Sequence, residues 1–237
     1  MAITLDSTSH GNNGGSASSL TVSHTMLGSG IKQALVVFVR IDSPNVVDAV
    51  TYAGVSMTLV NTISGVGGGP WPSNLFCYRL YNPTFGTNNI VATCTGNHAL
   101  EITAAGYNNV YTGYVRSPIM GGTSASGGDI LTSTAGPGNI LIGRIIACFS
   151  YSYNYLPAVL VPTAGGTNEV VDSYGGGNGA TLFDYDIPGA GTYSIGGTLT
   201  GSATGSLELN YIALVQDNTP YDRGDFFLVI PKMRNTP

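Results

Sequence analysis

Glycine is scattered along the whole chain, and this feature excludes more folds than any other. The sequence holds 34 glycines in 237 residues, which is about twice the usual share of about 7%. Each glycine weakens a helix by about 1 kcal/mol relative to alanine, so a mainly helical fold is excluded. Because 43% of the residues are hydrophobic, the chain is also too apolar to be a disordered segment.

The apolar residues fall in short runs that are separated by glycine, asparagine and proline. The runs 34–41 (ALVVFVRI) and 140–149 are apolar on both faces, which predicts central strands. Residues 207–215 alternate, and this alternation puts Leu207, Leu209, Tyr211, Ala213 and Val215 on one face. Ala53 and Gly54 supply the turn of a hairpin between residues 46–52 and 57–60. By contrast, the glycine- and serine-rich stretch 121–138 is interpreted mostly as loop.

About a dozen such strands, spaced roughly 8–15 residues apart, indicate a sandwich or barrel. The prediction is an all-β fold: an antiparallel β-sandwich, jelly-roll-like, with two packed sheets. Residues 90–95 and 100–103 are expected to form neighbouring strands. No charge run or change of composition divides the chain, so residues 1–237 are expected to form one domain. Residues 226–230 are expected to add a last strand within an extended arm, residues 216–237.

The chain carries few charges and is slightly acidic. Charged residues make up 9% of it, and the net charge is −5. Such a chain cannot neutralise a run of phosphates, so no nucleic-acid partner is expected. No membrane association is expected either, because no apolar run is long enough to span a bilayer. The opening residues MAITLD lack the features of a signal peptide, which predicts synthesis in a host cytoplasm.

The reactive residue types show no arrangement that is typical of an enzyme. Three cysteines, Cys77, Cys94 and Cys148, lie in apolar runs, which favours buried, unpaired thiols. The three histidines, His10, His24 and His98, are interpreted as structural or exposed residues, since no nucleophile motif accompanies them. We therefore expect no catalytic residues and no cofactor.

One pair of carboxylates leaves three interpretations open. Asp184 and Asp186 are two residues apart on a predicted strand, so they share a face, with Tyr185 on the opposite one. The pattern favours a solvated strand face. The pair could also bind Ca²⁺ together with Asp172, because this ion takes oxygen ligands. Two carboxylates could equally serve as the acid and base of a glycosidase.

Aromatic residues mark candidate contacts. Phe149, Tyr151, Tyr153 and Tyr155 alternate with small polar residues. This pattern favours a core or inter-sheet face, and it leaves contact with a subunit or a ligand open. Trp71 lies between two prolines on a predicted loop. It is the best single candidate for a contact residue, and the pattern favours a role as an anchor of that loop equally.

Several stretches together resemble a loosely defined group of proteins. The stretches are residues 19–25 (SLTVSHT), 50–60 (VTYAGVSMTLV) and 75–96 (LFCYRLYNPTFGTNNIVATCTG). They resemble glycine-, serine- and threonine-rich β-sandwich proteins of tailed-phage virions and bacterial surfaces, over about residues 2–150. The resemblance implies a jelly-roll-like sandwich that acts as a capsid decoration protein, a fibre or a tail component. It supplies no catalytic residues.

These observations predict a structural virion protein. An uncharged exterior of Ser, Thr, Asn and Gly keeps little charge repulsion, so it favours contact with copies or partners. The expected partners are the major capsid protein and the chain itself, with a trimer suggested by the architecture alone. The alternative is a glycan-binding adhesin or tail-fibre module that recognises a host surface. It predicts exposed aromatic residues such as Trp71 and Tyr153 around a shallow groove, with Ca²⁺ at Asp184 and Asp186.

Overall fold

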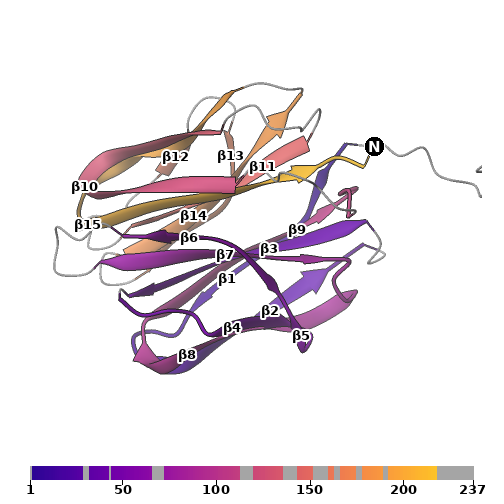
Figure 1. Cartoon of the computed structure of the whole chain (residues 1–237), viewed down its shortest axis with the longest axis horizontal. Helices are drawn as coiled ribbons and strands as arrows, with labels where there is room; N and C mark the ends of the chain where they lie inside the picture. The colour runs from indigo at the N-terminus through magenta and orange to yellow at the C-terminus, as the bar shows by residue number, and fades with distance from the viewer. Residues whose placement is uncertain are drawn as a thin grey trace, which may run out of the picture.

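The computed structural model shows an all-β protein, which confirms the predicted fold class. It describes residues 2–28, 32–42, 44–65, 72–112, 120–135, 143–151, 160–162, 166–174, 178–188 and 192–217. These residues form fifteen strands and no helix, so no helix in the described part of the chain could cross a membrane. The strands build three antiparallel sheets that are stacked in layers (Figure 1).

The first two layers use the N-terminal half of the chain. The outer sheet has the order β2-β8-β4-β5, and the middle sheet has the order β1-β9-β3-β7-β6. Their bounds are β1 (Thr4–Asn12), β2 (Ala17–Met26), β3 (Gln33–Asp42), β4 (Ala49–Tyr52), β5 (Val55–Ser56), β6 (Thr58–Ser64), β7 (Ser73–Tyr81), β8 (Gly86–His98) and β9 (Leu100–Asn108).

The pairing of these strands is that of a jelly roll. Strand β4 pairs with β5, β3 with β7, β2 with β8 and β1 with β9. The chain therefore forms one long antiparallel ribbon, and the ribbon rolls up so that successive pairs alternate between the two sheets. Strand β6 is added at the edge of the middle sheet, beside β7.

This rolling corrects one expected neighbour. The sequence predicts neighbouring strands at residues 90–95 and 100–103, but these residues lie in β8 of the outer sheet and β9 of the middle sheet. The chain turns a corner between the sheets at Ala99, the single residue that separates β8 from β9. Short spacing along the chain predicts pairing only where the turn keeps both strands in one sheet.

The expected turn at Ala53 and Gly54 is confirmed, but its hairpin is shorter than expected. Both residues have positive φ, 50° and 78°, as a tight two-residue hairpin requires. Strand β4 pairs there with only Val55 and Ser56. The next strand, β6, crosses to the middle sheet and pairs with β7.

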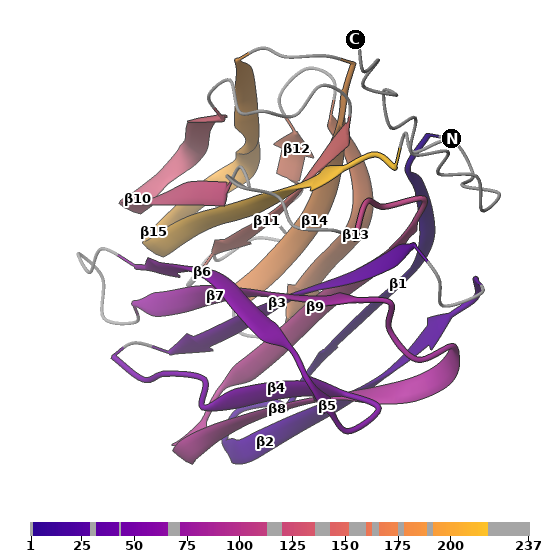
Figure 2. The ribbon, with the colours of Figure 1, turned by 45° about the vertical axis from the view of Figure 1, so that its right-hand side comes forward.

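The third sheet is a layer that the prediction of two packed sheets did not include. Its order is β10-β15-β11-β14-β13, and β12 pairs with β15. The bounds are β10 (Met120–Ala135), β11 (Gly143–Tyr151), β12 (Leu160–Pro162), β13 (Gly166–Tyr174), β14 (Asn178–Ile187) and β15 (Tyr193–Val215). Figure 2 shows this sheet arching over the middle one.

Strand β10 overturns the interpretation of residues 121–138 as mostly loop. It pairs with β15 along almost its whole length, and the register shifts on both sides of Gly128. Bulges and glycines let a strand bend without leaving its ladder, which explains why a glycine-rich sequence is a strand here.

Alternation along the strands divides the core into separate layers. In β3, Leu35, Val37 and Val39 pack between the outer and middle sheets, whereas Val36 and Phe38 pack between the middle and third sheets. The middle sheet is thus buried on both faces, which confirms the run 34–41 as a central strand. In β15 the predicted face is also confirmed, because it joins a third apolar cluster with Ile195 from the start of the same strand.

The described chain ends close to the jelly roll. Gln216 bridges to Val110, and the Asp217 backbone NH donates to the Asn109 carbonyl at 3.0 Å. Apart from these two residues, the expected arm at 216–237, with the strand expected at 226–230, lies outside the described residues.

Candidate functional site

The predicted carboxylate pair holds an arginine. Asp184 and Asp186 lie on one face of β14, and Tyr185 packs on the opposite side, as expected. Arg144 of β11 reaches both: its Nη1 lies 2.9 Å from Asp184 Oδ2, and its Nη2 lies 3.0 Å from Asp186 Oδ1. Burial lowers the pKa of Arg144, but the two carboxylates outweigh this effect and hold the pKa above its usual value.

The expectation of a solvated face holds for Asp186 and is wrong for Asp184. The Asp186 side chain is 80% exposed, whereas Asp184 is 2% exposed and also accepts a hydrogen bond from Tyr107 Oη at 3.2 Å. Asp172 pairs with Ala180, four residues along β14 from Asp184, so the two backbones lie about 13 Å apart along the sheet. Among the described residues no three His, Cys, Asp or Glu side chains are grouped to hold a metal ion.

The aromatic candidates separate into buried and undescribed residues. Phe149 and Tyr151 point into the third apolar cluster, and Tyr151 is 2% exposed. The core interpretation is thus confirmed for these two. Trp71, Tyr153 and Tyr155 lie outside the described residues.

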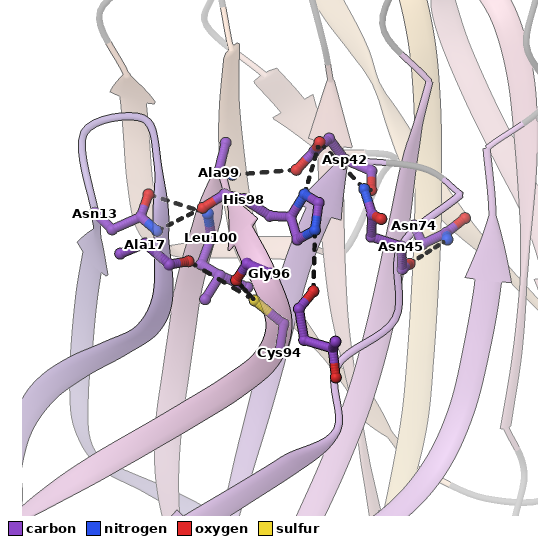
Figure 3. Close-up of polar contacts among 11 residues, drawn as sticks. Asn13, Ala17, Asp42, Asn45, Asn74, Cys94, Gly96, His98, Ala99 and Leu100 are labelled. Atoms are coloured by element: carbon purple, nitrogen blue, oxygen red, sulfur yellow. Dashed lines mark hydrogen bonds and ion pairs between the residues drawn. The ribbon is translucent and has the colours of Figure 1, made fainter.

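Two of the histidines bind carboxylates at the ends of strands. His10 Nε2 lies 3.0 Å from Glu101 Oε1. His98 Nδ1 lies 3.4 Å from Asp42 Oδ2, and Asp42 Oδ1 accepts from the Ala99 backbone NH at 3.1 Å (Figure 3). This contact fastens the end of β3 to the corner between β8 and β9, which is a structural role.

The cysteines are buried and free, as the sequence predicted. Cys94 Sγ donates to the carbonyls of Ala17 and Gly96 at 3.7 Å (Figure 3). Burial, followed by the nearby Asp48 and Asp42, raises the pKa of Cys94. Burial also raises the pKa of Cys77 and Cys148. None of the three is activated as a nucleophile, because that role needs a lowered thiol pKa.

His24 is buried between the outer sheet and β1, in a neutral form. Its Nδ1 lies 2.9 Å from Ser9 Oγ, and its Nε2 lies 3.2 Å from Ser7 Oγ. Burial lowers the pKa of the imidazole to about 4, although Asp6 acts in the opposite direction. The folded chain therefore favours neutral His24 at pH 7.

This arrangement predicts a loss of stability in mild acid. The ordinary pKa is 6.5 and the folded value is about 4, so the contribution of His24 is present above pH 6.5 and is lost as pH falls through 4. Its size is about 3 kcal/mol. Urea unfolding at pH 7 and pH 4 should show wild type losing about 3 kcal/mol more than His24→Gln, which does not titrate. Equal losses in the two proteins would contradict this role.

A cluster of polar side chains, which we call the buried seam, lies between the middle and third sheets. Glu208 of β15 is fully buried, and its Oε2 accepts from Ser73 Oγ at 2.8 Å and from Ser150 Oγ at 2.6 Å. Arg40 of β3 is 6% exposed and stands directly opposite Glu101 of β9. Burial raises the pKa of Glu208, and Arg40 partly offsets this rise.

The buried seam contains charged residues that were not among the candidates predicted from the sequence. Within the described part of the chain, Arg40 Nε, Glu208 Oε1 and Thr103 Oγ1 are buried without hydrogen-bond partners. The three residues are at most 6% exposed, so the seam offers substrate no access. It can set how the sheets fit together, since buried polar groups tolerate few arrangements. A signal did exist for Arg40, which interrupts the otherwise apolar run 34–41. Glu208 gave no such signal, because it lies with Asn210 on the polar positions of the alternating strand 207–215.

The outer sheet presents an uncharged surface. Its four strands, β2, β8, β4 and β5, contain no Asp, Glu, Lys or Arg. One side of the sheet packs on the middle sheet, and the other is turned away from it (Figure 1). We call this second side the outer face. It is formed by Ser19, Thr21, Ser23, Thr25, Ala49, Thr51, Thr87, Asn89, Val91 and Thr93.

The fold and these surfaces define the class: an all-β protein in three layers, built on a jelly roll, with an uncharged outer sheet. No protein-family model matches the chain, and no curated protein or solved structure matches it.

Proposed function

We propose that this chain is a structural protein of a bacteriophage virion, placed on the capsid exterior as a decoration or cement protein. It acts through contacts with the major capsid protein and with copies of itself. The observation that carries the proposal is the charge-free outer sheet. The jelly roll adds support, and so does the resemblance of about residues 2–150 to β-sandwich proteins of tailed-phage virions and bacterial surfaces.

The physical reason is the low desolvation penalty of such a surface. Burying a charge in an interface is costly unless it is paired, whereas the smaller cost of burying a hydroxyl or an amide is offset by ordinary hydrogen bonds. Interface cores are correspondingly depleted of charged residues. In the outer face, Thr21, Val91 and Thr51 stand side by side on three strands. A regular row of short side chains gives a partner a flat and complementary surface.

Native particles provide the direct test. An antibody raised against the full chain should label the capsid surface of particles from the source in electron micrographs, and mass spectrometry should find the chain in them. Its absence from purified particles would overturn the proposal. Label confined to tail fibres, with binding to host polysaccharide that Trp71→Ala abolishes, would favour the glycan-binding alternative.

A charge placed on the outer face should weaken association. Thr21→Lys adds an exposed ammonium to β2, and surface changes of this kind usually alter stability by less than about 0.5 kcal/mol. We expect binding to capsids, or self-association in sedimentation, to weaken about tenfold or more. The matched control is Thr198→Lys, which adds the same charge to an exposed position of the third sheet. Equal effects of the two variants would contradict a role for the outer face.

A further inference from the structure

Two apolar side chains stand exposed together at one end of the outer sheet. Leu27 is 65% exposed and Phe85 is 62% exposed. Met26 and Gly86 form the last pair of the β2–β8 ladder, so the next step of the register places Leu27 beside Phe85. We call these two residues the apolar patch. It continues the uncharged outer face, and exposed apolar groups at the edge of such a face mark an interaction site.

The patch is held in place by its neighbours. The Leu27 backbone NH donates to Asp6 Oδ2 at 2.7 Å. On the other strand, the Gly86 carbonyl accepts from Tyr52 Oη at 3.1 Å, and Asn88 Nδ2 lies 3.4 Å from the Phe85 carbonyl. The backbone on both sides of the patch is therefore fixed, so a partner meets a preformed surface.

The chain leaves the described fold at the same end of the jelly roll. Asp6, which holds Leu27, also accepts from Asn108 Nδ2 at 2.9 Å. The next residue, Asn109, accepts from the Asp217 backbone NH, and Asp217 pairs with Lys32. The end of β15 and the start of β1 lie near one another in both views (Figures 1 and 2).

The sequence after residue 217 contains an apolar segment that could pack on the apolar patch. Residues 226–230 read FFLVI, five apolar residues in succession. The nine steps from residue 217 to residue 226 span at most about 32 Å in extended form. The segment of one copy can therefore reach a patch on an adjacent copy whose jelly roll is turned toward it. In the described part of the chain the patch is mostly exposed, so it is accessible to a second molecule.

We propose that residues 226–230 of one copy dock on the apolar patch of a neighbouring copy. This inference rests on the proposed assembly function and names the segment and the surface that join two subunits. Each such link adds to the contacts between the rigid parts of two copies, and linked contacts bind more tightly together than either does alone.

Disulfide trapping between two single variants tests this directly. Full-length Thr87→Cys, which places a thiol on the outer face beside Phe85 and keeps the patch, and full-length Leu228→Cys are mixed and mildly oxidised. The native cysteines are buried and leave the engineered thiols as the accessible ones. We expect a disulfide-linked dimer that contains one chain of each variant, and no such species when Thr198→Cys replaces Thr87→Cys. A link that forms only inside the Thr87→Cys/Leu228→Cys double variant would overturn the inference, and so would no link at all.

A second measurement does not depend on oxidation. Phe85→Ser removes an exposed ring, so folding should be retained and circular dichroism unchanged, while self-association weakens about tenfold. An unchanged association constant would count against the patch. If the chain is found on particles, but no disulfide-linked dimer forms and Phe85→Ser associates as strongly as wild type, this inference is wrong and the proposed function still stands. If the chain neither associates nor occurs on particles, the proposed function fails with this inference.

Discussion

Replacing Arg40 with Met is expected to lower the free energy of unfolding by about 3–5 kcal/mol. Arg40 faces the third sheet from β3 and is the cation that offsets the burial of Glu208. It also stands opposite Glu101. Without the guanidinium, two carboxyl groups remain in a buried interface with no positive partner from β3, which is the situation in which a buried ionic group is most costly. Urea unfolding at pH 7 measures the loss.

The double variant Arg40→Met/Glu208→Gln is the matched control. It removes the second charge and keeps an oxygen that the hydroxyls of Ser73 and Ser150 can donate to, so a large part of the lost stability should return. If the double variant is no more stable than Arg40→Met, the two residues act independently, and the seam is not a coupled unit.

The pH dependence of the seam has a defined sign. Burial raises the pKa of Glu208 above its ordinary 4.5, so the folded state favours the protonated acid. The contribution of this group is present below pH 4.5 and is lost as pH rises through the raised value. Glu208→Gln removes this dependence, and its stability should vary less with pH above 4.5 than that of wild type.

The pattern of apolar residues predicts strands correctly where it shows which faces of the strand are buried. The run 34–41 has no polar face until Arg40, and a strand of this kind must be buried on both sides. In residues 207–215 the alternation predicts that Leu207, Leu209 and Tyr211 share one buried face, and the structure confirms it. In both cases the side-chain period of two is a local property, so neighbouring residues carry the information.

The third sheet could not be predicted in this way. Strand β10 has few apolar residues, and its pairing with β15 brings together residues that are 58 to 92 positions apart, from Ala135 with Tyr193 to Met120 with Ile212. Local composition indicates a loop, while the ladder depends on a partner that no short window contains. The number of layers was missed for the same reason.

In the candidate site, too, local spacing predicts some features, and others depend on residues that are far apart in the sequence. Spacing alone placed Asp184 and Asp186 on one face, which is correct, but Arg144 stands forty residues earlier than Asp184 and was not connected with them. Arg40 and Glu208 are further apart still. The position of Arg40 within an apolar run signals a buried charge, whereas alternation places Glu208 on the polar face of its strand. Only the stacking of the sheets reveals that the two charges face each other.

Replacing Phe38 with Ala is expected to lower the free energy of unfolding by about 3–5 kcal/mol. Phe38 is 1% exposed and lies in the apolar layer that joins the middle and third sheets, together with Leu182 and Ile212. Removing the ring leaves a cavity between two sheets, which cannot close unless both backbones move. The control is Phe85→Ala, the same change at an exposed position, which should alter stability by less than about 0.5 kcal/mol.

The same variant shows whether the three layers unfold together. Ile90 lies in the other inter-sheet layer, between the outer and middle sheets. If the middle sheet couples both layers, Phe38→Ala and Ile90→Ala each move one common unfolding transition, seen alike by fluorescence and circular dichroism. If Phe38→Ala instead splits the transition and leaves a later step at the wild-type position, the jelly roll is stable without the third sheet. The expected single transition follows from β3, because its two faces fill both cores and neither can open without exposing this strand.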